Sequence, residues 1–198
     1  MTPKFNASLV AAVALMIGCA RQNSQNETPN ESAAISGPKT QTETTIQPAQ
    51  SHFESLQALD WLVGNWVNKD ENATSSSSFK WDKNKNFLIQ HFVVHATGQK
   101  ELDGHQIIGW DPSENKIRSW IFDSDGGFGE STWSQDGANW YASTVFTLSD
   151  GRKASTTHVY TKINDNTYTF ASNDRDIDGQ ILPNIGPFTF IRKQERAE

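Results

Sequence analysis

Tight-turn sequences recur at short intervals from residue 83 onward, and this spacing limits the fold more than any other feature of the chain. Glycine takes positive φ angles without steric cost and aspartate tolerates them, so Asp-Gly pairs and Asn-rich segments are typical of hairpin turns. The segments between them are short and rich in Thr, Val, Ile, Phe, Tyr and Trp, which favour β-strands. The Asp-Gly pairs begin at Asp103, Asp125, Asp136, Asp150 and Asp178, and the Asn-rich turns cover residues 83–86 and 164–166.

About ten strands in simple succession are predicted from these turns. A short amphipathic helix is expected before them, over residues 54–62, with Leu56, Leu59 and Leu62 on one face. The connections are too short for crossover helices, so the sheet is expected to be antiparallel. The predicted fold is an all-β, up-and-down β-barrel, because closure removes exposed strand edges; a β-sandwich is the alternative. The expected strands are 65–69, 75–82, 87–97, 103–110, 116–123, 128–135, 139–148, 153–163, 166–174 and 186–192.

The first residues have a layout typical of a secretion signal. Lys4 precedes an apolar run over residues 9–17 that is far shorter than the about 20 residues needed to cross a bilayer. The run ends in Met16-Ile17-Gly18-Cys19, which resembles the lipobox of bacterial lipoproteins, with Met16 where Leu is usual. The resemblance implies that Cys19 carries a lipid, and Ala20 after it favours the outer membrane. The expected location is the bacterial cell envelope, lipid-anchored and facing the periplasm.

Three segments are therefore expected: a signal peptide over 1–18, the lipidated cysteine and a flexible linker over 19–52, and one folded domain over 53–198. The linker is polar and cannot bury enough surface to offset its ordering entropy. Cys19 is the single cysteine, so the domain is expected to fold without disulfides. The net charge of −6 and the absence of basic runs argue against a nucleic-acid partner. The expected partners are the membrane, through the lipid, and a small-molecule ligand.

The two ends of the predicted domain carry a second resemblance. A short helix leading into Gly64-Asn65-Trp66 is similar to the Gly-x-Trp opening of lipocalins and their relatives, the calycins. The resemblance implies that Arg192, on the last strand, packs across Trp66 and closes the barrel floor. A buried cation over an indole contributes about 2 kcal/mol. The segments 109–112 and 118–124 also resemble a set of uncharacterised bacterial lipocalin-like domains, for which no catalytic residue is implied.

A candidate ligand site follows from alternation along three consecutive strands. Successive side chains of a strand point to opposite faces. Placing Leu88 and Gln90 inside predicts that Gln106 and then Arg118 also point inward, toward a cavity walled by tryptophans. Apolar walls with a few convergent polar groups are typical of ligand sites. The alternative is a filled barrel in which Arg118 pairs permanently with Glu130. The candidate binding residues are Gln90, Gln106, Arg118, Trp120, Phe122, Asp123 and Glu130.

Motifs for catalysis, metals and cofactors are absent from the sequence. There is no nucleophile elbow, His-Glu-x-x-His or paired-cysteine pattern. His91 and His95 would lie about 13 Å apart along a strand and could not share a zinc ion. Nitrobindin-like calycin relatives use a histidine to hold heme, but no motif here selects such a histidine. The sequence predicts no cofactor and no metal. A small-molecule enzyme (isomerase or hydrolase) using Arg118 and Glu130, and an interaction protein with a solid barrel and exposed Phe87, Ile89, Val93 and Ile121, remain alternatives to a binding barrel.

Overall fold

The computed structural model describes residues 51–69 and 73–194. The predicted signal peptide, Cys19 and nearly all of the predicted linker lie outside these residues. A short helical segment comes first, as expected: the α-helix α2 (Phe53–Leu56) continues into the 3-10 helix η2 (Gln57–Leu62). Residues three apart eclipse one another in a 3-10 helix, so Leu56, Leu59 and Leu62 form one stripe, and all three are fully buried. No helix among the described residues is long and apolar enough to cross a bilayer.

The predicted antiparallel β-barrel is confirmed, and a sandwich is not formed. Ten strands close into a cylinder because β9 pairs with β8 on one edge and with β11 on the other, while β11 pairs with β1. An extra strand, β10, was not predicted and pairs with the end of β9. The strands are β1 (Gly64–Lys69), β2 (Ala73–Trp81), β3 (Phe87–Ala96), β4 (Leu102–Asp111), β5 (Lys116–Asp123), β6 (Phe128–Asp136), β7 (Asn139–Thr147), β8 (Lys153–Asn164), β9 (Thr167–Ile177), β10 (Gln180–Leu182) and β11 (Ile185–Arg192).

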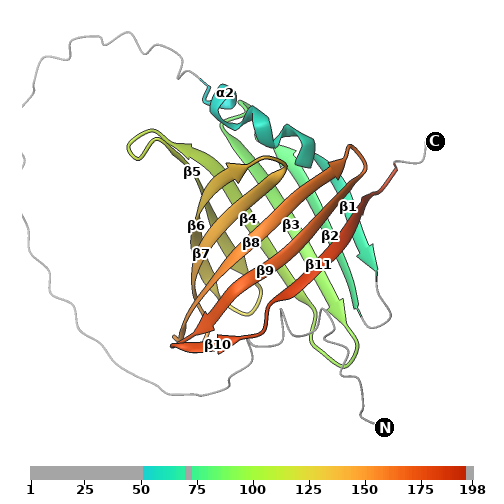
Figure 1. The fold of residues 1–198 in the computed structure, drawn as a ribbon, viewed down its shortest axis with the longest axis vertical. Coiled ribbons are helices and arrows are strands. Elements are labelled where there is room, and N and C mark those ends of the chain that lie inside the picture. The colour runs from blue at the N-terminus through green and yellow to red at the C-terminus, as the bar shows by residue number, and fades with distance from the viewer. Residues whose placement is uncertain (1–50, 70–72, 195–198) are drawn as a thin grey trace, which may run out of the picture.

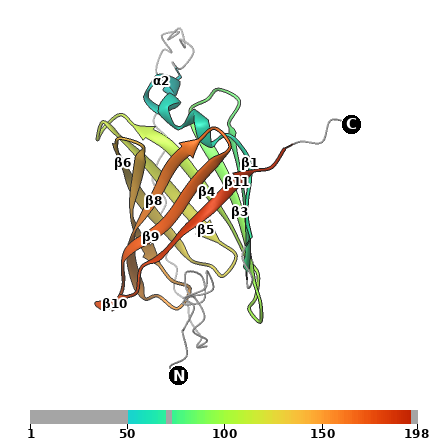
Figure 2. The same ribbon diagram turned by 45° about the vertical axis from the view of Figure 1, so that its right-hand side comes forward.

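The helical segment lies at one end of the barrel and β10 lies at the other (Figure 1). We call these the helix end and the open end. Trp81, the last residue of β2, holds the helical segment in place: its indole Nε1 donates to Asp60 Oδ1 at 2.8 Å, and its ring meets Phe53 edge-on. The slanted strands run between the two ends (Figure 2), so each strand contributes side chains to both ends of the interior.

Most of the predicted turn signals are confirmed. The glycines that follow Asp125, Asp136, Asp150 and Asp178 all have positive φ and lie in the connections between strands. The pair at Asp103 is the exception, because Asp103 and Gly104 lie within β4. Gly104 is needed there for a packing reason: a Cβ at this position would collide with the ring of Phe92 on β3. At this position the glycine therefore indicates not a turn but the close approach of the Phe92 ring to the β4 backbone.

Large side chains fill the interior at the helix end. Aromatic rings contact one another there: Tyr168 stacks on Phe190 at 4.9 Å between ring centroids and meets Trp66 edge-on at 4.8 Å. Trp133 stacks on Tyr160 at 5.3 Å. The helical segment closes this end by placing its leucine stripe on the aromatic layer. The buried cluster consists of Leu56, Leu59, Leu62, Trp66, Phe79, Leu88, Ile108, Ile117, Trp133, Trp140, Ala142, Tyr160, Tyr168 and Phe190.

Arg192 closes the same end, as the resemblance implied. Its guanidinium lies 4.1 Å from the centroid of the Trp66 ring, and the two residues are paired across β1 and β11. Its nitrogens also donate to the backbone oxygens of Trp61, Val63 and Asp165. One side chain thus ties together the helical segment, the first strand and the turn between β8 and β9.

Candidate ligand cavity

A cavity of about 240 Å³ occupies the interior toward the open end. Aromatic rings of the packed cluster, among them Tyr160 and Tyr168, form its floor. Its walls toward the open end are largely aliphatic and aromatic, formed by Val94, Leu102, Phe146, Leu148, Ile177 and Leu182.

A ring of uncharged polar side chains runs around the inside of the barrel between the packed cluster and the open end. Each pair in it joins the two strands of one hairpin, and nearly all of its members are buried. The pairing satisfies hydrogen-bonding groups that burial would otherwise penalise. We call this set the polar ring. Its pairs are Gln90 with Ser77 (2.8 Å), Gln106 with Ser119 (2.8 Å), Ser131 with Thr144 (2.8 Å) and His158 with Ser172 (2.9 Å).

The ring is joined to the packed cluster through Ser119, which is fully buried. Its Oγ accepts a hydrogen bond from the Trp133 indole Nε1 at 2.9 Å as well as the one from Gln106. An indole N–H can only donate, so the hydroxyl of Ser119 supplies the acceptor that this buried tryptophan requires.

His158 is the one titratable member of the ring, and it is held neutral. Burial, with a smaller repulsion from Arg175, lowers the pKa of its imidazole to about 4. The imidazole of His158 is stacked on the phenyl ring of Phe170, with 5.3 Å between their centroids, and its Nδ1 contacts the Ser172 hydroxyl. The polar ring therefore carries no net charge at neutral pH.

Charged groups border the cavity nearer the open end. Arg175 is 8% exposed and lines the cavity, with its Nη1 donating to the Pro183 backbone oxygen at 2.9 Å. Asp176 and Asp123 line it as well. Asp123 also holds its own turn, because its Oδ1 accepts from the backbone N–H groups of Asp125 and Gly127. Asp123 was among the predicted binding residues and does line the cavity, whereas Arg175 was not predicted.

Two of the candidate residues point into the barrel as predicted, namely Gln90 and Gln106. The prediction that Arg118, Trp120 and Phe122 face inward is wrong. Their neighbours Ile117, Ser119 and Ile121 take the interior face of β5, because Gln106 of β4 is paired with Ile121 rather than Trp120. Phe122 is 52% exposed.

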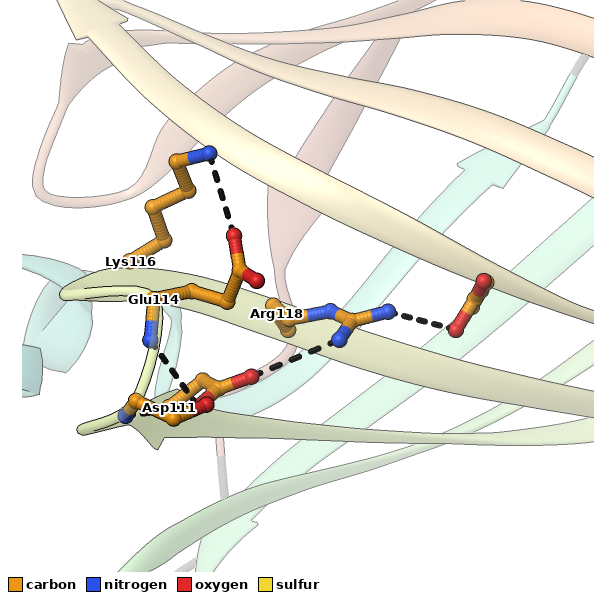
Figure 3. Close-up of polar contacts among 6 residues, drawn as sticks. Asp111, Glu114, Lys116 and Arg118 are labelled. Atoms are coloured by element: carbon orange, nitrogen blue, oxygen red, sulfur yellow. Dashed lines mark hydrogen bonds and ion pairs between the residues drawn. The ribbon is translucent and has the colours of Figure 1, made fainter.

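Arg118 forms ion pairs on the outer face, where Glu130 also lies. Its guanidinium is 2.6 Å from Glu130 Oε2 and 3.3 Å from Asp111 Oδ2 (Figure 3). The permanent Arg118–Glu130 pair was expected as the alternative to a ligand contact, and it is present, but outside the barrel. The Glu130 side chain is 49% exposed. An enzyme that uses Arg118 and Glu130 inside a pocket therefore has no basis in this arrangement.

The histidines of β3 and β4 also lie on the outer face. His91 and His105 are paired across the two strands, with ring centroids 4.7 Å apart. His91 contacts Asp103 at 2.9 Å, and His95 contacts Glu101 at 2.8 Å. Within the part of the chain that the structure describes, no three His, Cys, Asp or Glu side chains are grouped so that they could hold a metal ion.

The exposed apolar surface proposed for an interaction protein is only partly where it was expected. Phe87 is 42% exposed, but Ile121 lines the cavity instead of the outer face. His158 was not among the predicted cavity residues. The signal that could have found it is its position two residues before the large aromatic Tyr160, on the same face of β8.

The fold and the site together define a closed antiparallel β-barrel that is packed at one end and hollow at the other. A scan against models of known protein families finds no match to this chain, and a search of curated proteins finds none either.

Proposed function

We propose that this protein is a lipocalin-like binding barrel, anchored by a lipid on Cys19 and facing the periplasm, that holds a small amphipathic or acidic molecule. The observation that carries the proposal is the cavity: its walls are apolar, and a few buried polar groups converge on it. This combination is how small-ligand sites are generally built. Arg175, in place of the predicted Arg118, is the cation that lines the cavity and could attract an acidic group.

The binding step is tested by filling the cavity. Ala154 lines it on β8, so Ala154→Phe is expected to place a phenyl ring in the space that the ligand needs. Ala138→Phe, at an exposed turn of the helix end, is the matched control. Binding of straight-chain C6 to C10 alcohols and acids would be measured by calorimetry and by tryptophan emission. In the wild type and the control, each added methylene that fits is expected to contribute about 0.8 kcal/mol, or about four-fold in Kd. Equal binding by Ala154→Phe would overturn the proposal.

The anchoring step is tested separately. Cells expressing the full chain would be fractionated, and the mature amino terminus would be analysed by mass spectrometry. The wild type is expected in the membrane fraction with an acylated Cys19, and Cys19→Ser in the soluble fraction without acyl groups. A soluble, unmodified wild type would refute the anchor and leave the cavity proposal standing.

A further inference from the structure

The inward-facing residues of β3 and β4 change character in the same order from the helix end to the open end. On β3 the buried cluster residue Leu88 is followed by Gln90 and then by Phe92 and Val94. On β4 the order is Ile108, Gln106, Gly104 and Leu102. The polar ring is thus the deep layer of the cavity, and the aliphatic side chains form a second layer nearer the open end.

We infer that the ligand binds head first, with an uncharged hydrogen-bonding head group, such as a hydroxyl or an amide, on the polar ring and an apolar tail directed to the open end. The inference rests on the proposed function and names the chemistry and the orientation of its ligand. It reverses the arrangement expected for an acid held at Arg175, whose charged head would stay near the open end and whose tail would point inward.

Unused hydrogen-bonding capacity in the deep layer supports this orientation. Gln90 and Gln106, which are paired directly across β3 and β4, each use one amide hydrogen, toward Ser77 and Ser119. A primary amide has two donors and an acceptor with two lone pairs. An alkyl tail pressed against these groups would leave them unsatisfied, whereas a head group would bond to them.

The distribution of charged residues disfavours an ionic head group at this depth. The polar ring consists of Ser, Thr and Gln side chains and the neutral imidazole of His158. An ionised carboxylate or ammonium there would be removed from water with no opposite charge within the ring, which is costly. The charged residues that line the cavity, Asp123, Arg175 and Asp176, lie nearer the open end.

The shape of the outer layer suits a tail. Leu102 at the start of β4, Ile177 at the end of β9 and Leu148 just after β7 are buried apolar residues, and all three line the cavity. Leu182, on β10, adds a fourth apolar side chain from the strand at the open end. A chain of several methylenes would bury its surface against these residues on its way out of the barrel.

The test compares three ligands that share one alkyl chain: 1-octanol, octanoate and octylammonium, titrated at pH 7 into the wild type, Gln106→Leu and the control Gln135→Leu. Gln135 is exposed on β6 and lies outside the cavity. Octanol is expected to bind at least about ten-fold more tightly than either ion, and Gln106→Leu is expected to weaken octanol about ten-fold, the effect of one lost buried hydrogen bond. Gln135→Leu is expected to bind like the wild type.

Orientation is read independently, on the wild type, from NMR contacts between octanol and the protein. The methylene next to the hydroxyl is expected to contact the rings of Tyr160 and Tyr168, and the terminal methyl is expected to contact Leu148 and Ile177. If octanoate binds more tightly than octanol, or the terminal methyl contacts the tyrosines, the head-first inference is overturned while the proposed binding function stands. If none of the three ligands binds, the proposed function fails as well.

Discussion

Arg192 and Trp66 face each other at the helix end, with the guanidinium 4.1 Å from the indole centroid. The same guanidinium donates to the backbone oxygens of Trp61 and Val63, and the Trp66 Nε1 donates to Leu62 O at 2.7 Å. Cation, indole and helix end are therefore one hydrogen-bonded unit that joins the last strand to the start of the domain.

Replacement of Arg192 by methionine is expected to destabilise the domain by about 3 kcal/mol, because it removes the cation over the indole and leaves backbone oxygens without donors. Urea unfolding measures the change. Arg152→Met is the control, because Arg152 pairs with Asp150 in an exposed turn, where such a pair contributes at most about 1 kcal/mol. Equal losses in the two variants would show that Arg192 has no special role.

Gly64→Ala is expected to cost about 2 kcal/mol or more for two separate reasons. Gly64 has φ of +124°, which is unfavourable for alanine, and its new Cβ would collide with Arg192 Nη1. Gly98→Ala separates the two effects, because Gly98 has φ of +76° and open space around it; it is expected to cost only about 1 kcal/mol. Thermal unfolding of both variants checks the order, and a larger loss for Gly98→Ala would contradict it.

Ser119→Ala is expected to cost about 1–3 kcal/mol, because the buried donors of Trp133 and Gln106 lose their shared acceptor. The tryptophan emission should also shift as the indole N–H loses its partner. Ser143→Ala, on the outer face of β7, is expected to change neither quantity. A stability of Ser119→Ala equal to that of the wild type would mean that the polar ring does not need this hydroxyl.

His158 predicts a specific loss of stability in mild acid. Its folded-state pKa of about 4 lies below the ordinary value of 6.5, so between these values the unfolded chain binds a proton that the folded protein does not. Stability is therefore full above pH 6.5 and falls toward pH 4, by up to about 3 kcal/mol. His158→Gln should flatten this part of the stability curve in urea titrations. The carboxyls of Asp111, Asp150 and Asp165 have lowered pKa values, so their contributions are lost only below pH 3.8. Parallel curves for wild type and variant would disprove the role of His158.

Arg118→Ala is expected to leave ligand binding unchanged and to alter the free energy of unfolding by about 1 kcal/mol or less, because its ion pairs lie on the outer face. The octanol titration and a urea curve measure both. A large loss of octanol binding would contradict the outward position of Arg118 that follows from the pairing of β4 with β5.

The sequence by itself determined the fold class, the helical segment and the approximate strands, and the resemblance of its two ends to lipocalins implied the Arg192–Trp66 closure. These features depend on local turn chemistry, on alternation and on a short motif. The sequence also placed Gln90 and Gln106 correctly inside the barrel. On β3, the face with Gln90 has one polar residue, whereas the face with His91 and His95 has two, so the Gln90 face was assigned to the interior.

Tertiary structure alone decided which face of β5 is internal, because a one-residue change in strand pairing exchanges the two faces. The predicted strand ends left five residues, 111–115, between β4 and β5, which would place Arg118 inside. Instead Asp111 joins β4 opposite Lys116, which shortens the connection to four residues and puts Arg118 outside. The inward position of Arg175 could not be predicted from alternation either. Asp174, with φ of +51°, is an extra residue in β9, and it shifts the pairing with β8 so that Arg175 points inward. Alternation defines two faces of a strand, but only the pairing with its neighbours decides which of them lines the cavity.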